Sequence, residues 1–161
     1  YRLIPVLEDA AAVASDTGLP LMRAMVLAFP DDWTAARFET QYMLGDDLLV
    51  VPVLEPDGRA RYWLPEGDWY DFWTGAHLVG GCLVEEVVPL ERLPVFVRAG
   101  AVLKLGPTVR HTGEIDPLCR VEAVRVYGTP RPDGARWEAG IVEWTDRKLK
   151  IADRIEVIEV S

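Results

Sequence analysis

Cysteine and histidine are scarce in this sequence. Its 161 residues include two cysteines, Cys82 and Cys119, and two histidines, His77 and His111. These residues form neither a CxxC pair nor an HExxH motif, which are common zinc-binding spacings. We therefore predict no metal site and no cofactor. Free buried thiols fit a reducing, cytoplasmic location better than a secreted scaffold held by disulfides.

Positive charge and long apolar runs are also in short supply. Lys and Arg number 17 against 26 Asp and Glu, so the net charge is −9, which excludes a basic nucleic-acid surface. The longest apolar run, LLVVPVL, is far shorter than the roughly 20 residues that cross a bilayer, so no membrane span is predicted. The sequence has no nucleophile elbow, P-loop or GxGxxG motif, which leaves acyl transfer and nucleotide chemistry without support.

The beginning of the chain carries the pattern of an α/β unit. Apolar residues three and four apart predict a helix over residues 1–17. The run LMRAMVLAF, residues 21–29, is apolar on both faces and predicts a buried strand of a parallel sheet. A second helix is expected over residues 33–44, with Asp32 as N-cap and Gly45 as C-terminal cap. One such unit leaves its strand edges unpaired and the sequence lacks an initiator methionine, so we expect a fragment.

After Gly45 the sequence changes to short strands separated by turn residues. Strands are expected in DLLVVPVL, ARYWL, DWYDFW, CLVEEVV, VFVRAG and AVLKLG, and further strands in RVEAVRVYG and KIADRIEVIEVS. Strands at this spacing are typical of an antiparallel sandwich followed by a second β unit. The expected fold class is thus α+β and mostly β.

Two adjacent aspartate pairs, Asp31–Asp32 and Asp46–Asp47, resemble the acid and base of a hydrolase. Glycosidases hold two carboxyl groups about 5–5.5 Å apart when they retain configuration and about 6.5–9.5 Å when they invert it. The expected helix between the pairs, about 12 residues long, would separate them by about 18 Å. We therefore predict that these aspartates cap helices and turns and that none of them is catalytic.

Aromatic residues cluster along two neighbouring predicted strands. The members are Tyr62, Trp63, Trp69, Tyr70, Phe72 and Trp73. Strand alternation would place Trp69, Asp71 and Trp73 on one face and Tyr70 and Phe72 on the other. At least one face must be core. The other is expected to pack against a neighbouring domain, and a carbohydrate-contacting platform is the alternative.

Four segments occur in one order and at natural spacing. They are YRLIPVLEDAAAVASDTGLPLMRAMVLAFPDDW, QYMLGDDLLVVPVLEPDG, YWLPEGDWYDFWTG and LPVFVRAGAVLKLGP. Together they resemble the C-terminal portion of glycoside hydrolase family 31 enzymes, over about residues 1–107. The first segment looks most like the bacterial α-xylosidase branch, and the third fits the α-glucosidases equally well.

The resemblance implies a division into three parts. Residues 1–45 would end a (β/α)₈ TIM barrel, residues 46–107 would form a proximal β-sandwich, and residues 108–161 would begin a distal β domain. Family members are retaining α-glycosidases whose two catalytic aspartates lie on earlier barrel strands. No position here matches them, so this chain is expected to hold no catalytic residue, and its substrate-binding residues stay unassigned.

The resemblance also suggests a role for the chain. The parent enzyme would hydrolyse α-linked xylosides or glucosides, while this part closes and supports the barrel. One alternative is a stand-alone carbohydrate-binding β-sandwich. Another is a purely structural or subunit-contact domain, such as one that forms a homo-oligomer. The doubly apolar run at residues 21–29 favours the barrel, because an independent binding module has no use for such a strand.

Overall fold

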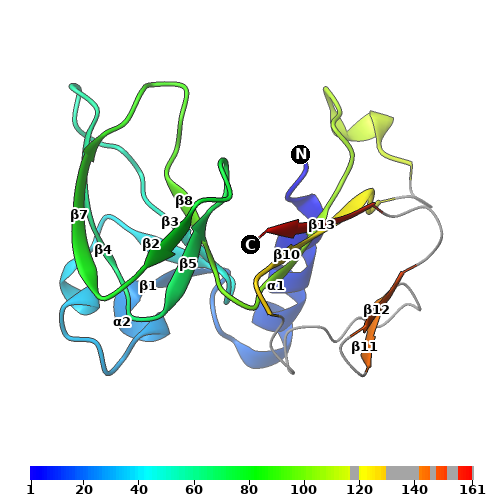
Figure 1. The fold of residues 1–161 in the computed structure, drawn as a ribbon, viewed down its shortest axis with the longest axis horizontal. Helices are drawn as coiled ribbons and strands as arrows, with labels where there is room; N and C mark the ends of the chain where they lie inside the picture. The colour runs from blue at the N-terminus through cyan, green and yellow to red at the C-terminus, as the bar shows by residue number, and fades with distance from the viewer. Residues whose placement is uncertain (117–119, 130–141, 146–147, 152–155, 161) are drawn as a thin grey trace. The chain divides into compact units, whose positions relative to one another are not determined.

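A computed structural model describes residues 1–116, 120–129, 142–145, 148–151 and 156–160 of the chain (Figure 1). The described residues form several β-sheets and little helix, which agrees with the predicted, mostly β fold class. They divide into two compact units. The sandwich unit comprises Ala10–Ala99, and the second unit comprises Tyr1–Asp9 and Gly100–Ser161.

The first helix confirms the prediction for the start of the chain. Helix α1 spans Ile4–Thr17, with Pro5 in its first turn, where a missing N–H costs no hydrogen bond. The helix ends at Gly18, which has a positive φ of 77° and donates its N–H to the carbonyl of Ala14 at 3.0 Å. Glycine adopts this left-handed conformation without the penalty that a Cβ would bring.

The predicted buried strand over residues 21–29 is wrong beyond its first part. Strand β1 covers only Met22–Ala24, and the next residues form a short helix, α2 (Met25–Ala28). Strand β1 pairs antiparallel with β2 (Tyr42–Leu44) rather than with a parallel neighbour. A continuous apolar run suits a strand or a helical turn equally well, so its periodicity could not separate the two.

The helix predicted over residues 33–44 is also wrong. Only one 3₁₀ turn forms there, η1 (Ala35–Arg37), and β2 follows it. Strand β2 pairs antiparallel with β3 (Leu48–Val50), with Leu44 opposite Leu48. Gly45, at a φ of 62°, therefore begins the three-residue loop of a hairpin instead of capping a helix.

The antiparallel sandwich predicted from the strand spacing is confirmed in the sandwich unit. Its larger sheet has six strands in the order β1-β2-β3-β8-β5-β6, so β8 lies between β3 and β5. The remaining members of this sheet are β5 (Asp68–Asp71), β6 (His77–Val79) and β8 (Val95–Arg98). A two-stranded ribbon, β4 (Arg59–Leu64) with β7 (Cys82–Val87), forms the second layer (Figure 1).

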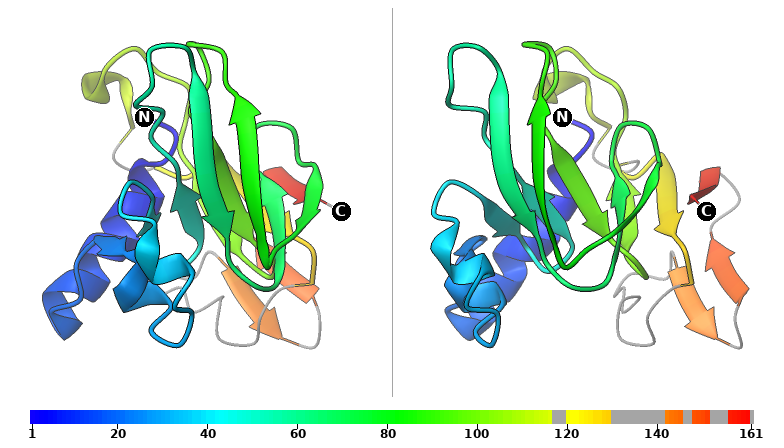
Figure 2. Two further views of the ribbon diagram at one scale, coloured as in Figure 1. Left: turned by 90° about the vertical axis from the view of Figure 1, so that its left-hand side faces the viewer. Right: turned by 60° about the vertical axis from the view of Figure 1, so that its left-hand side comes forward.

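Strand β4 shows how the two layers of the sandwich close. Ala60, Tyr62 and Leu64 are buried, whereas Arg59 and Arg61, on either side of Ala60, are exposed. The buried set packs in one core with Leu49, Trp69 and Phe96 of the larger sheet. Alternation along a strand thus directs one side of the ribbon to the core and the other to solvent. Figure 2 shows the ribbon and the larger sheet from two further sides.

The second unit contains the later strands. Strand β9 (Val102–Leu105) pairs antiparallel with β10 (Ala123–Tyr127), and β10 pairs parallel with β13 (Glu156–Val160). A separate hairpin joins β11 (Val142–Thr145) and β12 (Lys148–Ile151), and η2 spans Thr112–Glu114. Strands are therefore confirmed in AVLKLG and RVEAVRVYG. The predicted strand in KIADRIEVIEVS is confirmed at its two ends, and residues 152–155 lie outside the described residues.

Candidate functional site

The two members of the first aspartate pair differ in their contacts. Asp32 accepts the backbone N–H groups of Thr34 and Ala35 on Oδ1, each at 2.9 Å, and the indole N–H of Trp63 on Oδ2 at 2.8 Å. The helix that Asp32 was predicted to cap is absent, and Thr34 is the N-cap residue of η1. Asp32 instead caps the turn that leads into η1. Asp31 is exposed and has no hydrogen bond or ion pair with any residue that the structure describes.

The second pair lies in the loop between β2 and β3. Asp46 forms an ion pair with Arg23, a buried side chain of β1 that also donates its Nε–H to the carbonyl of Pro20 at 3.2 Å. The backbone carbonyl of Asp47 accepts the N–H of Arg98 at 2.9 Å. The separation of 18 Å expected between the pairs does not apply, because the helix on which it rested is absent. Asp46 instead fixes a hairpin loop to the neighbouring strand.

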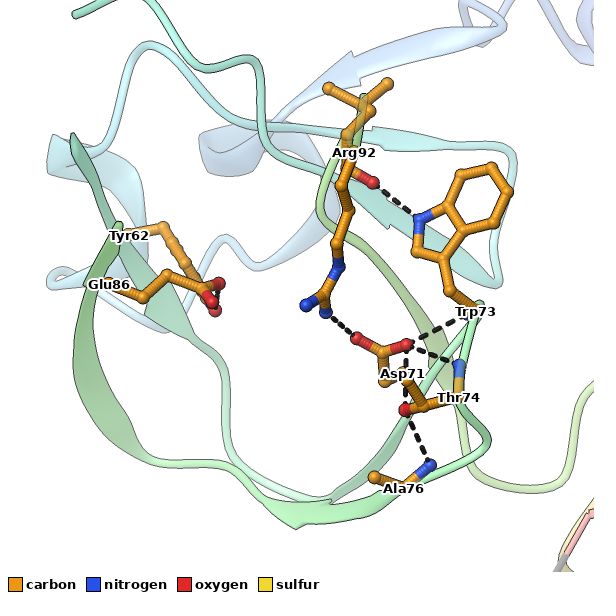
Figure 3. Close-up of polar contacts among 8 residues, drawn as sticks. Tyr62, Asp71, Trp73, Thr74, Ala76, Glu86 and Arg92 are labelled. Atoms are coloured by element: carbon orange, nitrogen blue, oxygen red, sulfur yellow. Dashed lines mark hydrogen bonds and ion pairs between the residues drawn. The ribbon is translucent and has the colours of Figure 1, made fainter. Parts of the chain in front are cut away.

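The most buried carboxylate of the sandwich unit is Asp71, at the end of β5 (Figure 3). Its Oδ1 accepts the N–H of Trp73 at 2.9 Å, and the N–H and hydroxyl of Thr74 at 2.8 and 3.0 Å. Its Oδ2 forms an ion pair with Arg92. Four donor groups therefore converge on this one carboxylate, and bonds to a charged group are stronger than bonds between neutral groups. Asp71 is therefore arranged to close the turn at the end of β5.

The loop that carries Arg92 is held to the same turn by a second contact. The indole N–H of Trp73 donates to the carbonyl of Leu93 at 2.6 Å. Arg92 therefore reaches Asp71 from a loop that is fixed beside it (Figure 3). The Nε of Arg92 is buried and has no hydrogen-bond partner among the described residues. No motif or spacing in the sequence pointed to Arg92 as the partner of Asp71, 21 residues away.

A second polar pair lies between β4 and β7. The hydroxyl of Tyr62 donates to Oε1 of Glu86 at 2.7 Å. Burial raises the pKa of Tyr62 far above its ordinary value, and the hydrogen bond to Glu86 raises it further. The Tyr62 hydroxyl accordingly keeps its proton and acts as a donor, so this pair joins the two strands by a side-chain hydrogen bond.

The aromatic cluster is mostly core. Trp69 and Tyr70 are buried although they are neighbours on β5, because both faces of this strand are covered. Trp73 is 56% exposed and lies beyond the end of the strand. Strand alternation therefore holds within β5 but cannot be extended to Trp73. The expectation that at least one aromatic face is core is confirmed.

The described thiol and imidazole groups form no cluster that could hold a metal ion. Cys82 is free and exposed, so the prediction that it is buried is wrong, and Cys119 lies outside the described residues. His77 contacts Asp68 at 2.9 Å, and His111 contacts Glu114 at 3.4 Å, both at the surface. Among the residues that the structure describes, no three His, Cys, Asp or Glu side chains are grouped to hold a metal ion. Within the same residues, no helix has the length and apolar character of a membrane span.

Replacing Asp32 by alanine is expected to lower the free energy of unfolding by about 1–2 kcal/mol. The change removes the acceptor of two backbone N–H groups and of the Trp63 indole. Asp31→Ala is the matched control, since this neighbour is exposed, and a change within about 0.5 kcal/mol is expected. Urea denaturation followed by tryptophan fluorescence measures both. Equal effects of the two substitutions would contradict the capping role.

The described residues form a β-sandwich unit whose carboxylates hold turns and loops, and comparisons with known proteins give its family. The model of the glycosyl hydrolase family 31 C-terminal domain matches residues 18–103, more than half of the chain. The chain belongs to glycoside hydrolase family 31, and the part that matches is the C-terminal domain. The resemblance noted in the four sequence segments is thereby confirmed.

Individual relatives agree with this assignment. The chain is 41% identical over 105 residues to an isomaltosyltransferase of Sporosarcina globispora, covering 65% of this chain and 10% of that protein. It is 39% identical over 117 residues to an α-xylosidase of Saccharolobus solfataricus, covering 71% and 16%. The solved structure of a Flavobacterium johnsoniae family 31 dextranase complexed with isomaltotriose matches with a TM-score of 0.74 and 33% identity, covering 80% and 16%. The chain therefore spans between a tenth and a sixth of these relatives.

Proposed function

We propose that this chain is the C-terminal part of a retaining α-glycosidase that hydrolyses α-linked glucosides or xylosides. The barrel ends within residues 1–45, before β1 (Met22–Ala24), which already belongs to the sheet of the sandwich unit. Residues 46–107 form the main part of the proximal sandwich, and residues 108–161 begin a distal β domain. The match of the family's C-terminal domain to residues 18–103 carries the proposal. The exposed free thiol of Cys82 supports a cytoplasmic enzyme, since a reducing compartment preserves it.

The chemistry of such an enzyme needs two carboxyl groups about 5–5.5 Å apart. One attacks the anomeric carbon and forms a covalent glycosyl-enzyme, while the other protonates the leaving oxygen and then activates water. We assign both groups to the part of the barrel that precedes this chain. The bonds of Asp32, Asp46 and Asp71 support this assignment, because each of these carboxylates is committed to local structure.

The role of this chain in the parent is to hold the last part of the barrel. Two contacts support this role. Arg23 of β1 pairs with Asp46 in the β2–β3 loop, and Asp32 accepts the indole N–H of Trp63 on β4. The segment between β1 and β2 is thus tied to the sandwich at both ends. These contacts fix β1 and β2 within the sandwich unit, and the end of the barrel that precedes them is held through this sheet.

The purified chain is expected to show no hydrolysis of p-nitrophenyl α-glucoside or α-xyloside above the buffer rate. A version that also carries the preceding barrel is expected to hydrolyse one of the two. Release of p-nitrophenol measures both, with a known family 31 α-glucosidase as the positive control. Turnover by the chain alone would overturn the assignment of the catalytic pair, and an inactive longer version would overturn the proposed function.

A further inference from the structure

Two hollows adjoin on the sandwich unit. The first, of about 630 Å³, is lined by Arg37 and Phe38 near η1 and by Arg61 and Trp63 of β4. The second, of about 680 Å³, includes Trp33 and again Trp63. Because Trp63 lines both, they form one groove between the loop around η1 and strand β4. Each hollow has the size of an ordinary small-molecule site, so the groove can accept several linked units.

Aromatic rings are placed along this groove. Trp33 is 82% exposed, and its ring has no stacking or hydrogen-bond partner among the described residues. Trp63 is half-buried, and its ring is held by the bond from its indole N–H to Asp32. The C–H bonds of a sugar ring are slightly positive and pack favourably on the negative face of an indole. One free ring and one fixed ring therefore offer two places for pyranose units.

The charges around the groove are mixed. The side chain of Arg37 has no hydrogen bond or ion pair with a described residue, and Arg61 lines the same hollow from β4. Glu39 lines the first hollow, and Asp31 and Glu66 line the second. Sugar hydroxyls donate and accept, so they can use both signs of charge. The carboxylates and the net charge of −9 disfavour a phosphate backbone in the same place.

We propose that this groove binds a neutral α-linked gluco-oligosaccharide. It lies on this chain, and none of its contacts belongs to the catalytic pair assigned to the barrel. Trp33 and Trp63 stack on successive sugar rings, while Arg37 and Glu39 hydrogen-bond their hydroxyls. The choice of an α-linked sugar rests on the proposed function, whereas the groove itself rests on the residues that line it. Such a site holds a polymer on the enzyme between cleavage events.

Titration calorimetry of the 161-residue chain with isomaltotriose tests the groove. Saturable binding is expected, weakened about tenfold by Trp33→Ala and about threefold to tenfold by Arg37→Ala. Arg59→Ala is the matched control, because this exposed arginine lies on β4 but does not line either hollow, and it is expected to leave the affinity unchanged.

Several outcomes would overturn the inference. These are no saturable binding, binding that Trp33→Ala and Arg37→Ala leave unchanged, or binding of a proline-rich peptide at these residues in place of the sugar. Equal binding of cellotriose, a β-linked control, would overturn the α-linked preference taken from the proposed function. The proposed function is measured separately by hydrolysis in the longer protein. If the longer protein hydrolyses the substrate but the groove binds no sugar, only the proposed binding groove is overturned and the proposed function stands.

Discussion

Asp71→Ala is expected to lower the free energy of unfolding of the sandwich unit by about 3–5 kcal/mol. The substitution leaves the guanidinium of Arg92 without its ion-pair partner in a mostly buried place. It also removes the acceptor for the N–H of Trp73 and for the N–H and hydroxyl of Thr74. A buried charge that loses its partner keeps the cost of desolvation without the attraction that offset it. Urea denaturation followed by tryptophan fluorescence measures the change.

Two further variants separate the parts of this effect. Asp71→Asn keeps an oxygen for the turn but loses the charge, so it isolates the contribution of Arg92. Glu85→Ala is the surface control, since Glu85 pairs with Arg61 at 2.9 Å and both side chains are 66% exposed. Exposed pairs contribute about 0–1 kcal/mol. If Asp71→Ala cost no more than this control, the turn at the end of β5 would not depend on its carboxylate.

Gly80→Ala is expected to destabilise the sandwich unit by about 3 kcal/mol. A Cβ at this position would lie 1.8 Å from the carbonyl oxygen of Pro65 and 3.0 Å from that of Gly67. Both obstacles are backbone atoms, so no side-chain rotation can relieve the clash. The backbone itself would have to move, and the bond from the Gly80 N–H to the Gly67 carbonyl, 2.7 Å long, would be lost or distorted. The midpoint of urea denaturation and the soluble yield measure the effect.

Gly18→Ala is the matched control for this clash. Gly18 has a φ of 77°, but a Cβ there would meet no atom within 4 Å. The substitution is therefore expected to cost about 1–2 kcal/mol through backbone strain alone. If the Gly80→Ala variant were as stable as the Gly18→Ala variant, the backbone at Gly80 would be able to move away from the backbone at Pro65 and Gly67 at little cost.

The sequence predicted the strands of the sandwich better than the segment before it. Strand β4 alternates polar and apolar residues over Arg59–Tyr62, and Gly58 and Pro65 mark its ends. Strand β7 is bounded in the same way by Gly81 and Pro89. Helix α1 was also predictable from its spacing and from Gly18. In each case one local pattern agrees with the structure that the chain adopts.

The segment around Gly45 shows why local patterns fail. A glycine with positive φ ends a helix as readily as it turns a hairpin, and the residues before it have aromatic and apolar side chains that suit either. Strand β3 decides between them, because β2 pairs with it through a three-residue loop. Burial of Met43 at 1% exposure, in the core that also holds Trp69, then fixes the extended conformation. Tertiary packing overrides a weak helical tendency.

The sequence allowed us to predict the role of the aspartates in turns, but not which side chains they would contact. The sequence indicated that aspartates would serve turns, and Asp32 does so. The partnership of Asp71 with Arg92 joins positions 21 residues apart and depends on how two loops meet, which no spacing rule supplies. The exposure of Trp33 likewise follows from the short turn η1, which replaced the expected helix.

The central position of β8 has a consequence for the order in which the sandwich unit can form. Strand β8 pairs with β3 on one side and with β5 on the other, yet it is the last strand of its sheet in the chain. Until Val95–Arg98 leaves the ribosome, β1-β2-β3 and β5-β6 are two separate pieces with open edges. Pairing between β3 and β8 slows folding, because the chain of residues 51–94 between them must close into a loop before the two strands can form contacts. During synthesis the sheet is therefore completed late and from its middle.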